Sequence, residues 1–316
     1  MTTKVLVIGG GQNAEHEVSL ASAAAVSAAL RMGDHEVTGV TIDQDGIWRV
    51  DGRPNGGSVA ESLALALPLL TRTDVVFPAV HGALGEDGAL AALCALAGVR
   101  VVGSGLRAGA VGMDKWTTKL VADAVGVRTA RGRLVAAEDI GDVEFEGEVA
   151  VKPVSSGSSH GVSLVTGEGQ LLAALREAAR FDRRILVEEV VSGREIDVAV
   201  LREKGGIRWA APPLEIHSVG LFDTATKYDG SARFTVPAQL DAAEVAALKR
   251  AAIAVFDALG CDGVARMDFF LTDRGPVLNE VNTMPGLTAA SQVPRMFAAV
   301  GVTYVDLVAR LVRAAT

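Results

Sequence analysis

The sequence predicts a protein of α/β and α+β units, in which an N-terminal parallel α/β domain precedes two further lobes. Three observations support this class. The first hundred residues alternate short apolar runs with Ala-rich segments of helical spacing, which is typical of parallel sheets. From about residue 104 to 188, strands flank a Gly/Ser turn, and from 189 onward the pattern is rich in strands. We therefore expect domains at 1–103, 104–188 and 189–316.

The composition limits the classes of partner. The formal net charge of −8 argues against binding nucleic acid or an anionic membrane through a basic surface. No apolar run reaches the ~20 residues that span a bilayer, and the start, MTTK, lacks the pattern of a signal peptide. Cys94 and Cys261 stand in apolar surroundings and are expected to be buried, reduced thiols. We expect a cytoplasmic protein with no nucleic-acid or membrane partner.

The elements of the N-terminal domain follow from their periodicity. Residues 4–10 form a run typical of a buried strand, and 15–32 has apolar residues at helical spacing. Strands at 36–42, 74–80 and 100–102 and a helix at 88–96 complete the predicted domain. Ligands of such sheets sit at the carboxyl ends of the strands.

The later lobes combine helices with hairpins. The segment EGEVAVKPVSSGSSHGVSLV is typical of two strands around a Gly/Ser turn. The remaining predicted elements are helices at 107–125, 170–180, 242–259 and 304–314 and a strand at 184–187.

The loop after the first strand matches the letters of a dinucleotide fingerprint. Gly9, Gly11 and Ala14 have its spacing. However, Glu15 and Glu17 fall in the first helical turn, where they compete with a phosphate for the positive end of the helix dipole. We therefore disfavour a dinucleotide site. The glutamates either stabilise the helix end, by about 0.3–1 kcal/mol each, or one of them binds a cation such as a substrate ammonium group.

Carboxylates and an amide gather in the segment RMDFFLTDRGPVLNEVNTMPGLT. Glu280 and Asn282 are two apart and share one face of a strand, and a hairpin through 272–275 brings Asp268 beside them. Oxygen ligands of this kind suit Mg²⁺. Arg266 points to the same face as Asp268 and suits a developing negative charge. The alternative is the solvated face of an ordinary hairpin.

A second glycine-containing loop suits phosphate. VKPVSSGSSHG places Lys152 at a strand end before small residues that include Ser158 and Ser159, which supply N–H and O–H donors. Lys115, at the end of GMDK, supplies a second cation. The alternative is a flexible hairpin without a ligand.

The strand in ILVEEVVSGRE indicates a nucleotide hinge. Backbone groups of Glu188, Glu189 and Val191 would read an adenine edge, and Glu195 suits ribose hydroxyls.

Taken together in this order, the motifs resemble the D-alanine–D-alanine ligase family of the ATP-grasp ligases. The resemblance runs from Lys4 to about Val312. It rests on EHEVS (15–19), HGALGEDG (81–88), GSG with MDK (103–105, 113–115), KPVSSGSSHG (152–161), TKY (226–228), RMD (266–268) and NEVNTMPGLT (279–288). It implies a two-lobed ATP-grasp fold after the N-terminal domain, with 104–188 as the central lid subdomain and 189–316 as the catalytic subdomain.

The resemblance also implies a reaction, the joining of two D-alanines for peptidoglycan precursor synthesis. ATP phosphorylates the carboxylate of the first D-alanine, and the amine of the second attacks the acyl phosphate. Activation is needed because oxide is a poor leaving group. The implied cofactors are ATP and two Mg²⁺ ions, or Mn²⁺ in their place. The implied partners are D-alanine, ATP and a second copy of the chain in a homodimer.

The same resemblance assigns roles to individual residues. Glu15 would hold the ammonium group of the first substrate and hydrogen bond with Ser158 and Tyr228. His81 would lie near the first substrate, and Ser291 would hold the carboxylate of the second. The implied ATP site has Lys115, Lys152, Ser158 and Ser159 at the phosphates and Lys227 near the γ-phosphate. Arg266 and the backbone N–H of Gly286 would form the oxyanion site, and the implied magnesium ligands are Asp268, Glu280 and Asn282.

Two departures from the family pattern concern the lid and the hinge. In LFDTATKY, Phe222 and Thr224 stand where tyrosines are common, and Glu189 and Val190 stand where a lysine and an aromatic residue are often found. The alternatives are therefore a related ATP-grasp ligase for other amino or hydroxy acids, or a binding protein without activity. Tyr228 favours an amine as the nucleophile, by analogy to the family.

Overall fold

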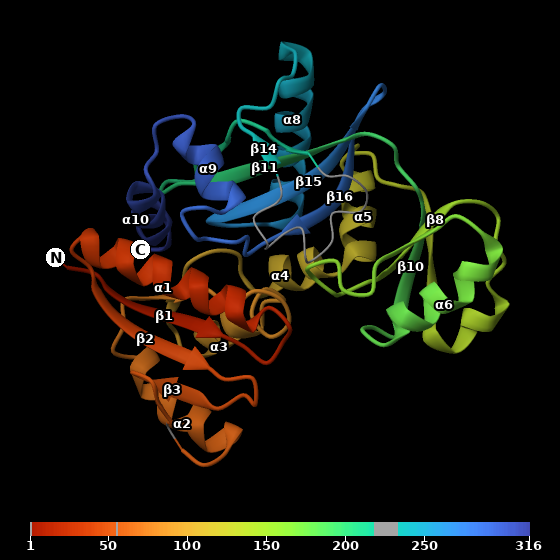
Figure 1. Ribbon diagram of the computed structural model, residues 1–316. Helices are drawn as coiled ribbons and strands as arrows, with labels where there is room; N and C mark the ends of the chain where they lie inside the picture. The colour runs from red at the N-terminus through yellow and green to blue at the C-terminus, as the bar shows by residue number, and fades with distance from the viewer. Residues whose placement is uncertain (1, 55, 218–232) are drawn as a thin grey trace.

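The computed structural model describes residues 2–54, 56–217 and 233–316. Three β-sheets succeed one another along the chain, each with its own helices (Figure 1). No helix in these ranges is long and apolar enough to cross a membrane. The LFDTATKY segment, with Lys227 and Tyr228, lies outside the described residues.

The first sheet has the strand order β4-β3-β2-β1-β5-β6. Strands β2, β1, β5 and β6 are parallel, as predicted. The chain then reverses in a tight turn between Asp43 and Ile47, so β3 and β4 extend the edge antiparallel, which the sequence analysis missed along with helix α2. The elements are β1 (Lys4–Gly10), α1 (His16–Met32), β2 (Glu36–Ile42), β3 (Trp48–Val50), β4 (Arg53–Pro54), α2 (Val59–Leu70), β5 (Val75–Pro78), α3 (Ala89–Leu96) and β6 (Arg100–Val101).

Strand β1 is buried on both faces. Val5 and Val7 belong to a core with Leu30 of α1, whereas Leu6 and Ile8 belong to the core on the opposite face with α2 and α3. Successive side chains of a strand alternate between faces. Burying each such side chain stabilises the fold by about 1.5–3 kcal/mol, so β1 holds the loop that follows it in a fixed place.

The prediction of a single helix at 107–125 is wrong. The structure has two helices, α4 (Leu106–Met113) and α5 (Lys115–Ala124). Asp114 between them is extended, with ψ near 99°, and its side chain accepts a hydrogen bond from the N–H of Thr117 (2.7 Å). The side-chain cap replaces the lost helical bonds, which explains a break without glycine or proline.

The second sheet is antiparallel, in the order β7-β10-β8-β9. Strands β8 and β9 flank the Gly/Ser turn as predicted, and α6 covers one face with Leu175 and Ala178 in the core. The elements are β7 (Gly132–Ala136), the 3-10 helix η1 (Ala137–Asp142), β8 (Val149–Pro153), β9 (Ser163–Val165), α6 (Glu168–Ala179) and β10 (Arg184–Glu189).

The third sheet has the order β14-β13-β11-β15-β16, with β12 paired to β11. Helix α8 covers one face and begins at a capping box between Asp241 and Glu244. The elements are β11 (Arg194–Arg202), β12 (Arg208–Ala210), β13 (Leu214–His217), β14 (Arg233–Thr235), α8 (Ala242–Leu259), β15 (Val264–Thr272), β16 (Gly275–Asn282), α9 (Gln292–Ala298) and α10 (Tyr304–Ala315).

The first and third sheets share a core. Phe297 of α9 and Leu311 of α10 belong to the same apolar cluster as Val7 and Leu30. Figure 1 shows α10 beside α1, with the second sheet projecting on the other side of the molecule. The predicted domain boundaries at 103 and 188 stay a prediction. Helices α4 and α5, which lie between these boundaries, contact α8 and β16 of the third sheet.

Candidate active site

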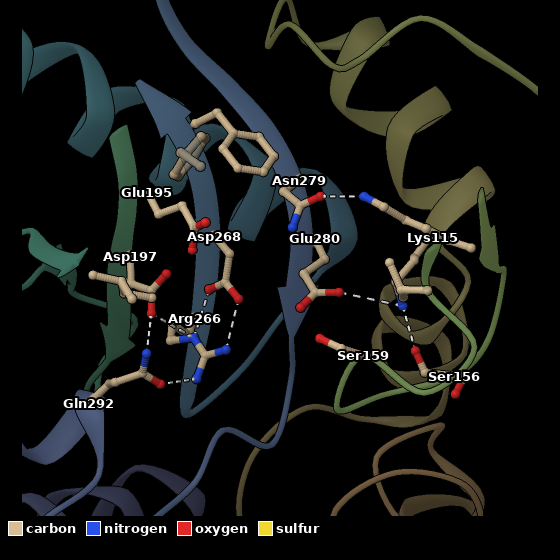
Figure 2. A pocket seen from close by; sticks show the side chains of 15 residues that line it. Lys115, Ser156, Ser159, Glu195, Asp197, Arg266, Asp268, Asn279, Glu280 and Gln292 are labelled. Carbon is tan, nitrogen blue, oxygen red and sulfur yellow. Dashed lines mark hydrogen bonds and ion pairs between the residues drawn. The ribbon is translucent and has the colours of Figure 1, made fainter. Parts of the chain in front are cut away.

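Two cavities meet at the hairpin β15–β16. The first lies between the third sheet and the Gly/Ser loop after β8 (Figure 2). The second lies between that loop, the loop after β5 and the turn after β16. Arg266, Glu280 and Gln292 line both cavities. The two cavities therefore share one wall, and groups bound in them would lie side by side.

Lys115 faces the acidic strands across the first cavity (Figure 2). It is the first residue of α5, and its Nζ donates to the backbone oxygen of Ser156 (2.7 Å). The same Nζ lies 3.4 Å from Glu280 Oε2. The predicted phosphate lysine thus links the Gly/Ser loop to the predicted metal strand.

Lys152 and Glu188 form a buried ion pair at the back of the first cavity. Lys152 Nζ also donates to Asn279 Oδ1 (2.9 Å). Glu188 is 3% exposed, and its second oxygen lies 2.9 Å from Nζ of Lys119, a residue that the sequence analysis missed. Burial opposes ionisation of Glu188, but Lys152 and Lys119 outweigh it and hold the pKa of Glu188 below its ordinary value.

The residues of the predicted nucleotide hinge do not line a single cavity. Glu188 points between the two lysines, and Glu195 of β11 lines the first cavity. Glu189 and Val191 line a third cavity, between α5, the end of β10 and the β15–β16 turn. There the carboxylate of Glu189 accepts a hydrogen bond from the N–H of Arg131 (3.0 Å).

The hairpin brings the predicted metal ligands together. Asp268 lies opposite Glu280 in the β15–β16 register, next to a β-bulge, and Asn282 Nδ2 donates to Asp268 Oδ2 (3.0 Å). In the described ranges, no group of three or more His, Cys, Asp or Glu side chains is arranged to hold a metal ion, so the candidate set consists of two carboxylates and one amide. These hard oxygen donors fit Mg²⁺, which takes its remaining ligands from water and phosphate.

Arg266 is held by acids on its own sheet. Its guanidinium donates two hydrogen bonds to Asp268 (2.7 and 2.8 Å) and one to Gln292 Oε1 (2.7 Å). Gln292 in turn donates to Asp197 (2.8 Å). Burial opposes the charge, but Asp268 and Asp197 raise the pKa of Arg266 above its ordinary value. A permanent cation therefore stands in the wall that the two cavities share; Figure 2 shows its bonds to Asp268 and Gln292.

Glu15 is enclosed by two loops in the second cavity. Its carboxylate accepts a hydrogen bond from Ser158 Oγ (2.5 Å), a link that the resemblance implies. A Cβ atom at Gly82 would lie 2.5 Å from Glu15 Oε2, and one at Gly157 would lie 2.8 Å from it. Only glycine lets both loops approach the carboxylate this closely.

The Gly/Ser loop carries backbone strain at this point. Ser158 and Ser159 both have left-handed backbones, with φ of 51° and 59°. Such a conformation costs about 1–3 kcal/mol per residue and persists where the surroundings hold it. The bond to Glu15 holds the loop, and Ser158 and Ser159 face the second and first cavities respectively.

His81 lines the second cavity, but both of its ring nitrogens have protein partners. Nδ1 lies 2.7 Å from the backbone oxygen of Met284, to which it must donate, and Nε2 lies 2.8 Å from Ser22 Oγ. Burial lowers the pKa of His81, which favours the neutral ring. It fixes the turn after β16 and has no ring nitrogen left for a direct hydrogen bond to substrate.

Glu86 is a further acid of the second cavity that sequence reasoning missed. Its carboxylate accepts hydrogen bonds from the N–H groups of Met284 (3.1 Å) and Gly82 (3.3 Å). Burial raises the pKa of Glu86 to about 7, and the charge of Glu15 adds to the shift. The available signal was its place in HGALGEDG, a loop that follows a strand end.

The predicted oxyanion donor and carboxylate site are neighbours. Gly286 lines the second cavity, and a Cβ there would lie 3.2 Å from Ser291 Oγ. Ser291 precedes α9, and its Oγ accepts from the N–H of Thr288 (3.1 Å). The tight turn therefore places Gly286 in the wall of the second cavity, with the Ser291 hydroxyl beside it.

The loop after β1 is occupied by its own hydrogen bonds. The N–H of Gly11 donates to the oxygen of Ile42 (2.7 Å), and the oxygen of Gly11 contacts His16 Nδ1 (2.8 Å). Glu15 itself is the N-cap of α1, and Glu17 stands in the first turn. The rejection of a dinucleotide site stays a prediction.

Known proteins resemble the chain over nearly its whole length. The family model described as D-ala D-ala ligase N-terminus matches residues 4–104, and that described as D-ala D-ala ligase C-terminus matches 141–313. A D-alanine–D-alanine ligase of Mycolicibacterium smegmatis is 38% identical, over 98% of this chain and 94% of the relative.

Two solved structures have the same fold. The D-alanine–D-alanine ligase from Coxiella burnetii is 30% identical, with a TM-score of 0.82 over 99% of this chain and 94% of its own. The VanG D-Ala:D-Ser ligase from Enterococcus faecalis is 29% identical, with a TM-score of 0.82 over the full length of both chains.

Proposed function

The chain belongs to the D-alanine–D-alanine ligase family, and from this premise we propose that the two cavities join D-alanine to D-alanine in an ATP-dependent reaction. The enzyme is an ATP-dependent ligase with an ATP-grasp fold. The proposal for the site rests on the wall that the two cavities share, formed by Arg266, Glu280 and Gln292. Ligands on the two sides of this wall would lie next to each other, as ATP and the first D-alanine must when the acyl phosphate forms.

We assign the second cavity to the two amino acids. Glu15, bonded to Ser158, pairs with the ammonium group of the first D-alanine. Arg266 and the N–H of Gly286 stabilise the oxyanion that develops when the second amine attacks. Ser291, beside Gly286, binds the carboxylate of the second D-alanine. His81 and Glu86 hold the loop that carries Gly286 through its neighbour Met284.

We assign the first cavity to ATP and magnesium. Lys115, Lys152 and Ser159 bind the phosphates, and Glu195 binds the ribose. Asp268, Glu280 and Asn282 would hold Mg²⁺, or Mn²⁺ in its place, and a bound ion would neutralise charge on the transferred phosphoryl group. Glu188, Glu189 and Val191 at the adenine, and Lys227 and Tyr228 in the segment outside the described residues, remain proposals from the family pattern.

The family reaction supplies a peptidoglycan precursor and consumes ATP, so we propose a cytoplasmic enzyme. A homodimer, and the division into an N-terminal domain (1–103), a lid (104–188) and a catalytic subdomain (189–316), are likewise proposals.

A coupled assay of ADP release tests the function. With Mg²⁺ and ATP present, we expect turnover that depends on D-alanine and a product with the mass of the dipeptide. L-Alanine should give none. D-Serine and D-lactate as acceptors separate this activity from that of relatives such as the D-Ala:D-Ser ligase. No turnover with D-alanine would contradict the proposal.

A further inference from the structure

A buried lysine behind the first cavity has no role in the site described so far. Lys119 lies one helical turn after Lys115 on α5, so both side chains project from the same face of the helix. It is 4% exposed, and its Nζ lies 2.9 Å from Glu188 Oε2. Lys152 pairs with the other oxygen of the same carboxylate.

The two lysines differ in what they face. Lys152 comes from β8 and lines the first cavity, where a ligand would reach it. Lys119 lines the third cavity and not the first. Glu188 lies between them, at 3% exposure. Glu188 therefore separates Lys152, which lines the first cavity, from Lys119, which lines the third.

The charges of this group do not balance. Among the described residues, Glu188 is the carboxylate with which either lysine forms an ion pair, so two cations share one anion. A buried surplus charge is costly, and a single lysine would suffice to pair a structural carboxylate. Burial indeed lowers the pKa of Lys119. The second lysine has a function if one of the two cations leaves Glu188 to bind another group.

We propose that Lys119 is a positioning residue for nucleotide binding, which keeps Glu188 paired while Lys152 turns to a phosphate group of ATP. Without Lys119, moving Lys152 would leave a buried carboxylate with no counter-ion, and this cost would subtract from the affinity for the nucleotide. Lys119 thereby makes the ion pair of Lys152 exchangeable. The inference rests on the proposed function, because it takes ATP as the ligand of the first cavity.

The test measures binding of a non-hydrolysable ATP analogue by calorimetry on the full chain. We expect Lys119→Met to raise the Kd for the analogue about 10-fold or more, the scale of losses when a supporting partner is removed. The KM for D-alanine should stay unchanged. Lys119→Arg keeps the charge and should restore affinity to within about threefold. Lys119→Gln replaces the methionine variant if that variant does not fold.

A double-mutant cycle separates this role from a structural one. In a Glu188→Gln background there is no carboxylate to keep paired, so Lys119→Met should change the Kd further by less than about threefold. Lys204→Met removes the same charge from an exposed turn and should bind like the wild type.

An equal loss in both backgrounds, or a Kd for Lys119→Met within twofold of wild type, would overturn the inference. A wild-type chain that does not bind the analogue would contradict the proposed function instead.

Discussion

The two cavities that share the wall of Arg266, Glu280 and Gln292 differ in the charged groups beside that wall. Around the first, Lys119 and Lys152 share one carboxylate. In the second, Glu15 and Glu86 are close enough for one to raise the pKa of the other. The first cavity has Lys115 and Lys152 beside the shared wall, and the second has Glu15. In the proposed assignment, the lysines bind a polyphosphate and Glu15 binds an ammonium group at neighbouring positions of one cleft.

The largest expected effect comes from the shared wall, because a change there should disturb both cavities. Glu280→Gln removes one of two carboxylates of the candidate magnesium set. We expect kcat to fall by at least about 10³-fold, since phosphoryl transfer depends on charge neutralisation. ADP release at saturating substrates measures this. Circular dichroism controls for folding, and a kcat within tenfold of wild type would remove Glu280 from the metal site.

A smaller effect, confined to the second cavity, is expected from Glu15→Gln. The loss of a charged hydrogen-bond acceptor for the ammonium group, about 1.5–3 kcal/mol, corresponds to a rise of about 10–100-fold in the KM for D-alanine. The affinity for ATP should change less than twofold.

Glu17→Gln, two residues on in the same helical turn, is the matched control and should leave both constants unchanged. Equal weakening of ATP and D-alanine in Glu15→Gln would break the division of ligands between the cavities.

The smallest effect is a pH dependence of stability. The folded-state pKa of Glu86 is about 7, above the ordinary 4.5. Between these values the folded chain holds a proton that the unfolded chain releases, so this contribution to stability falls as pH rises from 4.5 to 7. Because Glu86 is partly exposed, we expect a loss of roughly 1–3 kcal/mol.

Urea denaturation between pH 4.5 and pH 8 measures this term, and Glu86→Gln should lack it. If both proteins show the same pH profile, the carboxyl is ionised throughout and the crowding of acids in the second cavity is weaker than the structure indicates.

The sequence predicted the parts of the site that depend on local geometry. Asp268 faces Glu280 because a short turn sets the register of their hairpin, and alternation places Asn282 nearby. The bond between Glu15 and Ser158 joins residues far apart in the chain and came from the family resemblance alone.

The residues that the sequence analysis missed depend on tertiary packing. Lys119 on a helix is an ordinary solvated charge until the fold brings it to Glu188 of β10, and Glu86 is an ordinary loop acid until the turn at Met284 closes on it. The break at Asp114 was missed because a side-chain cap, not glycine or proline, ends the helix there.

The shared wall also has a consequence for inhibitor design. A single molecule that occupied both cavities would touch Arg266, Glu280 and Gln292 with both of its halves. Binding of the first half would place the second at a high effective concentration, so two weak fragments of opposite charge could combine into a tight bisubstrate inhibitor. The linker between them can be short, because the cavities have these three side chains in common.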